Sequence, residues 1–147
     1  MRKKGLTFIE LIIVLAVLTV MAAGISFIPA EKRQLNAAAQ QVINDIRFCQ
    51  RLALSESTWA RILFHESENA YSVDKWESTG YVRVKKESLG HYTESLFTNA
   101  SGKDIEYTSR GTTGDACTIR LSTKNYTVVM TVTVGAGRVK ITEIIDK

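Results

Sequence analysis

The sequence is poor in the residues that interrupt helices or hold metal ions. Its 147 residues include one proline, two cysteines and two histidines. His65 and His91 lie in separate segments, and neither has a cysteine or carboxylate at metal-ligand spacing. The sequence also lacks a glycine-rich phosphate loop, a dinucleotide fingerprint and a nucleophile elbow. We therefore expect no catalytic residue, no metal and no cofactor, and the protein is not expected to be an enzyme.

Charge is absent from one long segment near the N-terminus. Residues 11–28 contain no charged side chain, and counting from Leu6 gives 23 residues with a single charge, Glu10. About 20 apolar residues are needed for a helix to cross the hydrocarbon of a membrane. Residues 6–28 are therefore predicted to form a transmembrane helix. The basic residues at positions 2–4 predict a single pass, with the N-terminus in the cytoplasm and the rest of the chain outside.

Glu10 distinguishes three interpretations of this segment. A secretory signal peptide cut near Val20-Met21-Ala22 and a plain membrane anchor both leave the carboxylate without a purpose. An acidic residue at the centre of a membrane helix costs about 2.5 to 3.5 kcal/mol. The third interpretation rests on residues 5–11, Gly-Leu-Thr-Phe-Ile-Glu-Leu. This stretch closely resembles the prepilin leader of type IV pilins and type II secretion pseudopilins.

The resemblance implies a function for each residue of the motif. A prepilin peptidase would cut between Gly5 and Leu6, and the new N-terminus at Leu6 would be N-methylated. The family usually starts its mature chain with phenylalanine, so leucine is a departure here. Glu10 would occupy the fifth mature position and pair with the N-terminal amine of a neighbouring subunit during assembly. Pairing makes a buried carboxylate tolerable.

The periodicity after Pro29 predicts a second helical segment. Apolar residues recur at steps of three and four at Leu35, Ala39, Val42, Ile46, Cys49 and Ala53. We expect an amphipathic helix from Ala30 to about Ser55, with this stripe covering a core. Its continuity with the preceding helix is open, because proline removes a helical hydrogen bond and kinks the axis.

After Ser57 the pattern changes to the alternation of β-strands. About seven strands are expected, at residues 59–65, 70–76, 81–85, 104–109, 117–122, 126–134 and 138–144. The predicted fold class is α+β: a long N-terminal helix, transmembrane and then amphipathic, packed on an antiparallel β-sheet head in the manner of a pilin. The expected segments are a cleaved leader (1–5), a transmembrane or filament-core helix (6–28), an amphipathic helix half (29–56) and a β-rich globular head (57–147).

The chain from the second helix onward resembles the GspH/FimT group of minor pilins and pseudopilins. The resemblance lies in residues 45–53, the hairpin of residues 62–73, residues 105–111 and residues 137–140. It implies a structural subunit of a type II secretion or type IV pilus-like filament. The implied partners are other pilin or pseudopilin subunits, the prepilin peptidase and an inner-membrane assembly platform. The implied location is the cytoplasmic (inner) membrane, followed by an extracytoplasmic filament.

Cys49 and Cys117 both belong to the part of the chain expected outside the membrane, where a disulfide is permitted. A bridge would close a loop of about 69 residues and contribute about 4 kcal/mol in the chain-entropy model. Cys49 also lies on the apolar stripe, where a free cysteine acts as a small hydrophobic residue. Both alternatives stay open.

DNA capture is the alternative function. Some FimT-like minor pilins carry a basic Gly-Arg-x-Arg signature implicated in DNA capture, and residues 137–140 (Gly-Arg-Val-Lys) partly resemble it. Residues 117–147 hold five basic and two acidic side chains. Arg138 and Lys140 share one face of the predicted strand and could contact phosphates. A solvated strand face would show the same pattern, and lysine lacks the bidentate fork of arginine.

Overall fold

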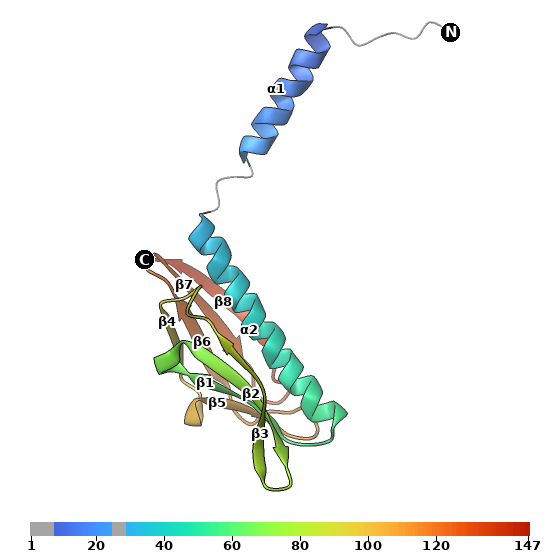
Figure 1. Cartoon of the computed structure of the whole chain (residues 1–147), viewed down its shortest axis with the longest axis vertical. Coiled ribbons are helices and arrows are strands. Elements are labelled where there is room, and N and C mark those ends of the chain that lie inside the picture. The colour runs from blue at the N-terminus through green and yellow to red at the C-terminus, as the bar shows by residue number, and fades with distance from the viewer. Residues whose placement is uncertain (1–7, 25–28) are drawn as a thin grey trace, which may run out of the picture. The chain divides into compact units, whose positions relative to one another are not determined.

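The structure is a computed structural model that describes residues 8–24 and 29–147 (Figure 1). The chain divides into two compact units, residues 1–30 and 31–147. The first contains helix α1, and the second contains nearly all of helix α2 and every strand described.

Helix α1 spans Phe8–Gly24 and carries apolar residues on every side, with Glu10 as its one charged residue. Every residue from Phe8 to Met21 is exposed. The hydroxyl of Thr19 donates to backbone carbonyls three and four residues earlier, so this polar group is satisfied within the helix. Within the described residues, no helix reaches the length and hydropathy needed to span a membrane. The predicted span, residues 6–28, extends past α1 at both ends into residues outside the described ranges.

Helix α2 spans Ala30–Ser55, which confirms the bounds predicted from its periodicity. Pro29 directly precedes it, a place where proline is tolerated because the first helical N–H groups have no partner within the helix. The predicted stripe is completely buried, with 0% exposure at Leu35, Ala39, Val42, Ile46, Cys49 and Ala53.

The strands of the described residues form two four-stranded antiparallel sheets. Sheet A has the order β3-β2-β1-β5 and consists of β1 (Ala60–His65), β2 (Ala70–Glu77), β3 (Gly80–Ser88) and β5 (Asp104–Tyr107). Sheet B has the order β4-β6-β7-β8 and consists of β4 (Ser95–Thr98), β6 (Cys117–Ser122), β7 (Tyr126–Val132) and β8 (Val139–Asp146). Short 3-10 turns, η2 (Glu66–Glu68) and η3 (Ser101–Lys103), precede β2 and β5.

All seven predicted strands are present, and β4 is the one that the alternation pattern missed. Only four residues long, β4 lies at the edge of sheet B, where its ladder partner is β6. Leu96 and Thr98 alternate inward, but a run this short carries too little periodicity to separate it from a loop.

A single hydrophobic core joins α2 to both sheets. In the second unit α2 runs alongside the strands (Figure 1). Strand β1 alternates buried and half-buried positions, so Ile62 and Phe64 point to the core while Arg61 and His65 face the opposite side. The structure therefore confirms the α+β class, with an N-terminal helix packed on antiparallel sheets.

Candidate functional site

Only part of the N-terminal motif, residues 5–11, lies within the described residues. Gly5 and Leu6 lie outside the described residues. Glu10 lies in the first turn of α1 and is exposed. A carboxylate in the first turn of a helix interacts favourably with the positive end of the helix dipole. Cleavage after Gly5, methylation of Leu6 and an assembly role for Glu10 stay predictions.

A buried carboxylate fastens α2 to sheet A. Asp45 is 8% exposed and accepts a hydrogen bond of 2.6 Å from the Tyr71 hydroxyl. The Nζ atom of Lys85 donates to both carboxylate oxygens of Asp45 at 2.9 and 3.0 Å. Burial, and then the bond to this carboxylate, raise the pKa of Tyr71. Asp45 is not one of the apolar stripe residues, and its partners on β2 and β3 cannot be inferred from helix periodicity.

A basic groove lies where α2 meets the connection between β7 and β8. Its volume is about 760 Å³, and its charged lining side chains are Arg47, Arg138 and Lys140. A second hollow adjoins it through Arg47 and Gln50 and adds Arg51. No acidic residue lines either hollow among the described residues.

The wall of the groove is held by hydrogen bonds from α2 and β5. The Nε2 atom of Gln50 donates to the carbonyl of Gly111 at 2.7 Å and to that of Ala136 at 3.0 Å. The Tyr107 hydroxyl donates to the carbonyl of Gly137 at 3.1 Å. Gly137 has a φ of +56°, and a side chain there would collide with the Tyr107 ring. The turn that presents Arg138 is therefore fixed against α2.

Two of the basic residues at the groove were predicted from the sequence, and two were not. Arg138 precedes β8 and Lys140 lies on it, both exposed on either side of buried Val139, as the strand period predicted. Arg47 and Arg51 were missed, because about 90 residues of chain separate them from Arg138. The three cations of the groove and Arg51 in the hollow beside it, with no lining carboxylate among the described residues, give this surface a charge that suits a polyanion.

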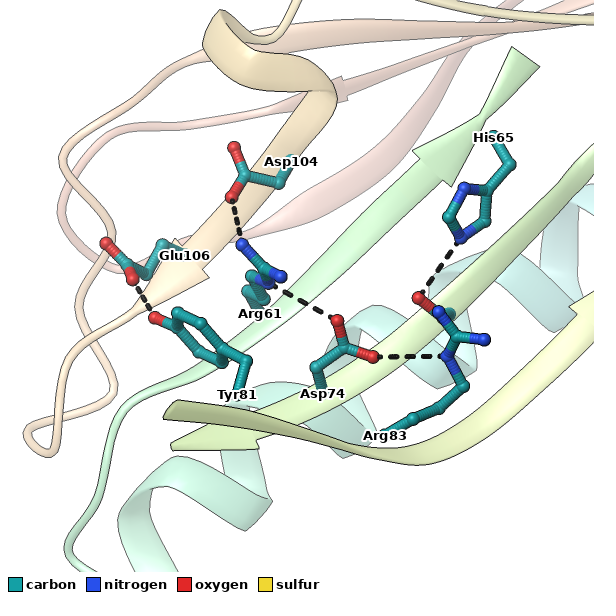
Figure 2. A network of polar contacts seen from close by, with 8 residues as sticks. Arg61, His65, Asp74, Tyr81, Arg83, Asp104 and Glu106 are labelled. Carbon is teal, nitrogen blue, oxygen red and sulfur yellow. Dashed lines mark hydrogen bonds and ion pairs between the residues drawn. The ribbon is translucent and has the colours of Figure 1, made fainter. Parts of the chain in front are cut away.

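The outer face of sheet A, which points away from the core, carries a network of charged side chains (Figure 2). Asp74 on β2 is 5% exposed and lies between two arginines. Arg61 Nε is 3.3 Å from one carboxylate oxygen of Asp74, and Arg83 Nε is 3.7 Å from the other. Arg61 also reaches Asp104 on β5 at 3.8 Å. From the residues that the structure describes, the Oδ1 atom of Asp74 accepts no hydrogen bond, so its pairing with Arg83 is ionic only.

The two cysteines are buried, free thiols in this structure. Burial raises the pKa of Cys49 to about 12 and that of Cys117 to about 11, which makes both poor nucleophiles. A bridge between them stays a prediction, which a count of reactive thiols after unfolding without reductant would test.

The histidines lie apart. The His65 ring pairs with the Ser72 hydroxyl at 3.3 Å, and the His91 ring stacks edge-on with Tyr92. In residues 8–24 and 29–147, no three His, Cys, Asp or Glu side chains are grouped so that they could hold a metal ion.

The comparisons with known proteins cover both parts of the chain. Residues 1–26 match the model of the prokaryotic N-terminal methylation motif. The fold is similar to that of the type IV minor pilin FimU of Pseudomonas aeruginosa in two crystal forms. In the first form the TM-score is 0.63 at 14% identity, covering 77% of this chain and 91% of FimU. In the second the TM-score is 0.58 at 13% identity, covering 74% of this chain and 92% of FimU. No curated protein sequence matches the chain.

The motif and the fold are two separate likenesses to pilins. The motif lies in the first 26 residues, and the structural likeness extends over about three quarters of the chain. The chain therefore combines a match to the prokaryotic N-terminal methylation motif with a fold similar to that of a type IV minor pilin.

Proposed function

We propose that the chain is a minor pilin or pseudopilin, a structural subunit of a type IV pilus-like or type II secretion filament. The observation that carries the proposal is the presence of the methylation motif ahead of a head with the fold of a minor pilin. The pilus is the favoured filament, because the matched structure, FimU, is described as a type IV minor pilin.

The route to the filament follows from the N-terminal residues. The peptidase cuts after Gly5, and Leu6 becomes the methylated N-terminus in a chain anchored in the cytoplasmic membrane with its head outside. The exposed apolar surface of α1 suits lipid before assembly and the helices of other subunits afterwards. Glu10 favours assembly in register, because pairing with a neighbour's amine offsets the cost of placing a carboxylate in an apolar medium.

The test is the mass and N-terminal sequence of the protein purified from cells. Wild type is expected to start at Leu6 and to carry about 14 Da of extra mass from one methyl group. Gly5→Ala is expected to accumulate as the uncut precursor, because a side chain obstructs the peptidase pocket. Gly114→Ala, with open space around the position, serves as the control and is expected to be processed normally.

Glu10→Ala separates processing from assembly. The variant is expected to be cut after Gly5 and yet to be lost from sheared filaments, because its partner amine has no carboxylate. A wild-type N-terminus near Ala23 or Gly24 would instead identify an ordinary secreted domain and overturn the filament role.

DNA capture is a second candidate, favoured by the basic groove. The groove and the hollow that adjoins it bring Arg47 and Arg51 of α2 near Arg138 and Lys140, and no carboxylate of the described residues lines either. Each phosphate neutralised on duplex DNA steepens the salt dependence of binding by about 0.9 in log–log slope. A few such contacts give weak binding that salt abolishes.

The measurement for this candidate is fluorescence anisotropy of labelled duplex DNA with the full chain in nonionic detergent, at several salt concentrations. Arg138→Gln is expected to lower the salt slope by about 0.9, whereas Lys124→Gln, outside the groove, leaves it unchanged. Equal losses in the two variants would mean that only net charge matters and would exclude the groove as the DNA site.

A further inference from the structure

Three aromatic rings and one carboxylate form a pocket on sheet A, next to the charged network. Trp76 on β2 is the register partner of Tyr81 on β3, and the Trp76 N–H donates to the carbonyl of Trp59 at 2.7 Å. The three aromatic residues therefore lie on neighbouring segments at one end of the sheet. Together with Glu106 they line a hollow of about 310 Å³, the aromatic pocket.

The two indole rings are unusually accessible. Trp59 and Trp76 are each 46% exposed, and they are the only tryptophans of the chain. Such large apolar side chains normally add to a core, and grouped at the surface they mark a binding site. The Trp76 and Tyr81 rings meet edge to face, with centroids 5.2 Å apart and planes at 83°, so their mutual geometry is fixed.

The carboxylate of the aromatic pocket is also held in place. The Tyr81 hydroxyl donates to the Oε1 atom of half-buried Glu106 (Figure 2). The guanidinium of Arg61 lies 4.0 Å from the centroid of the Tyr81 ring, while Asp74 and Asp104 neutralise it. The Arg61 guanidinium thus already covers one face of the Tyr81 ring, whereas the indole rings of Trp59 and Trp76 are accessible to a ligand.

The charge around the aromatic pocket is negative. In the network of Figure 2, the two arginines Arg61 and Arg83 face three carboxylates, those of Asp74, Asp104 and Glu106.

Lys75 alternates to the opposite face of β2 from Trp76, where it is shared between Glu56 at 2.9 Å and Glu77 at 3.3 Å, so this cluster adds no charge to the pocket. The network of Figure 2 alone leaves an excess of one negative charge on the face of the sheet that carries the pocket, and this excess attracts a cation.

We propose that the aromatic pocket binds a quaternary ammonium group, with the indole faces of Trp59 and Trp76 and the carboxylate of Glu106 as its contacts. Aromatic faces attract cations through the ring quadrupole, and Trp does so most strongly. A methylated cation presents an apolar shell to the rings and is weakly hydrated, whereas a bare ammonium is strongly hydrated. A neutral sugar would stack on the same rings but would make no use of the negative charge. The proposal stands apart from the filament role.

The probe is choline, added to the full chain in a polyoxyethylene detergent at constant ionic strength. Because both tryptophans line the pocket, their fluorescence reports binding directly. A saturable change with a Kd on the order of 1 mM is expected. The neutral isostere 3,3-dimethylbutan-1-ol is expected to bind at least about fivefold more weakly, because it has the shape without the charge. Equal binding of both probes, no binding of choline, or saturable binding of glucose instead of choline would each overturn the proposal.

Two variants locate the site. Glu106→Gln keeps an acceptor for the Tyr81 hydroxyl and removes the charge, so choline is expected to bind about fivefold more weakly. Glu143→Gln makes the same charge change at an exposed position on β8 and is expected to leave the affinity unchanged. Matching losses in both variants would show a response to net charge and would count against the aromatic pocket.

Phosphocholine distinguishes the two sources of this chemistry. Affinity equal to that of choline would support the pocket as a site for a lipid or polymer headgroup. Weaker binding would support a free quaternary ammonium compound, since the phosphate would then be repelled by the surrounding carboxylates.

Discussion

The two helices of this protein treat apolar surface in opposite ways. Helix α2 is amphipathic, and its stripe of apolar residues is completely buried against the sheets. Helix α1 carries apolar residues on every side, and its side chains from Phe8 to Met21 are exposed. An apolar stripe about one third of the circumference wide is buried when one side of the helix packs on the head. A helix with apolar residues on every side needs an apolar environment all around it. This difference indicates that α2 stabilises the head, while the surface of α1 is suited to contact with lipid or with the helices of other subunits.

The largest loss of stability is expected from truncating a buried side chain in the apolar stripe of α2. Ile46→Ala, at a position with 0% exposure, is expected to lower the free energy of unfolding of the head by about 3 kcal/mol, from lost burial and a residual cavity. Ile13→Ala on α1, where the side chain is 59% exposed, should change it by less than about 0.5 kcal/mol. Urea unfolding in nonionic detergent, followed by tryptophan fluorescence, measures both. Equal effects would break the comparison between the helices.

The next effect concerns the polar anchor of α2. Asp45→Ala leaves the buried Tyr71 hydroxyl without its acceptor and leaves Lys85 paired with Glu87 alone, at an expected cost of about 2 kcal/mol. Asn44→Ala, one residue earlier and exposed, should stay within about 0.5 kcal/mol of wild type. The same urea titration applies. If Asp45→Ala left the free energy of unfolding unchanged, apolar contacts alone would hold α2 on the sheets.

A smaller effect is expected where the end of α2 meets the loop after β5. Gly111 has a φ of +69°, and a Cβ there would lie 2.8 Å from the Leu54 side chain. Gly111→Ala should therefore cost about 1 to 2 kcal/mol, mainly from the left-handed backbone. Gly114→Ala meets nothing within 4 Å and should be neutral or slightly stabilising. Thermal unfolding of the two variants side by side would show whether this loop helps to fix the helix.

The smallest effect is a pH dependence within the head. Glu66 accepts from Lys103 Nζ at 2.7 Å and from the Thr98 N–H at 2.8 Å, and these bonds lower its pKa below the ordinary 4.5. Since the pKa is depressed in the folded chain, the stabilisation is complete above pH 4.5 and is lost as the pH falls through the folded value. Glu66→Gln should thus be less stable than wild type at pH 7, and the gap should close in acid.

A double-mutant cycle checks the cause of this pH dependence. The loss of stability caused by Glu66→Gln at pH 7 should be smaller in a chain that also carries Lys103→Gln than in wild type, because the main partner of the carboxylate is then already absent. A loss that is the same in both backgrounds and at every pH would show that the carboxylate charge does not contribute.

Local patterns were enough to predict much of the fold. The bounds of α2, the six residues of its stripe and seven strands follow from spacings of three to four or of two residues. Strand β4 escaped because four residues carry almost no periodicity. The grouping of strands into two sheets could not be predicted either, because ladder partners such as β1 and β5 are separated by more than 35 residues.

The candidate sites divide along the same line. The motif at Gly5, Leu6 and Glu10 is contiguous, so it could be identified from the sequence, although its roles stay predictions. Arg138 and Lys140 were found by strand alternation, whereas Arg47 joins them only through the packing of α2 on the loop before β8. The aromatic pocket had no sequence signal at all, since its residues come from β2, β3, β5 and the segment before β1.

The sequence by itself determined the leader motif, the helix that buries one stripe, and the alternating strands, because each depends on neighbours within a few residues. Tertiary structure alone decided that Asp45 is buried, that Arg47 faces Arg138, and that both tryptophans lie beside Glu106. These juxtapositions depend on which strands pair and on how α2 crosses them. Such long-range contacts are selected by the packing of the whole core rather than by any local preference of the chain.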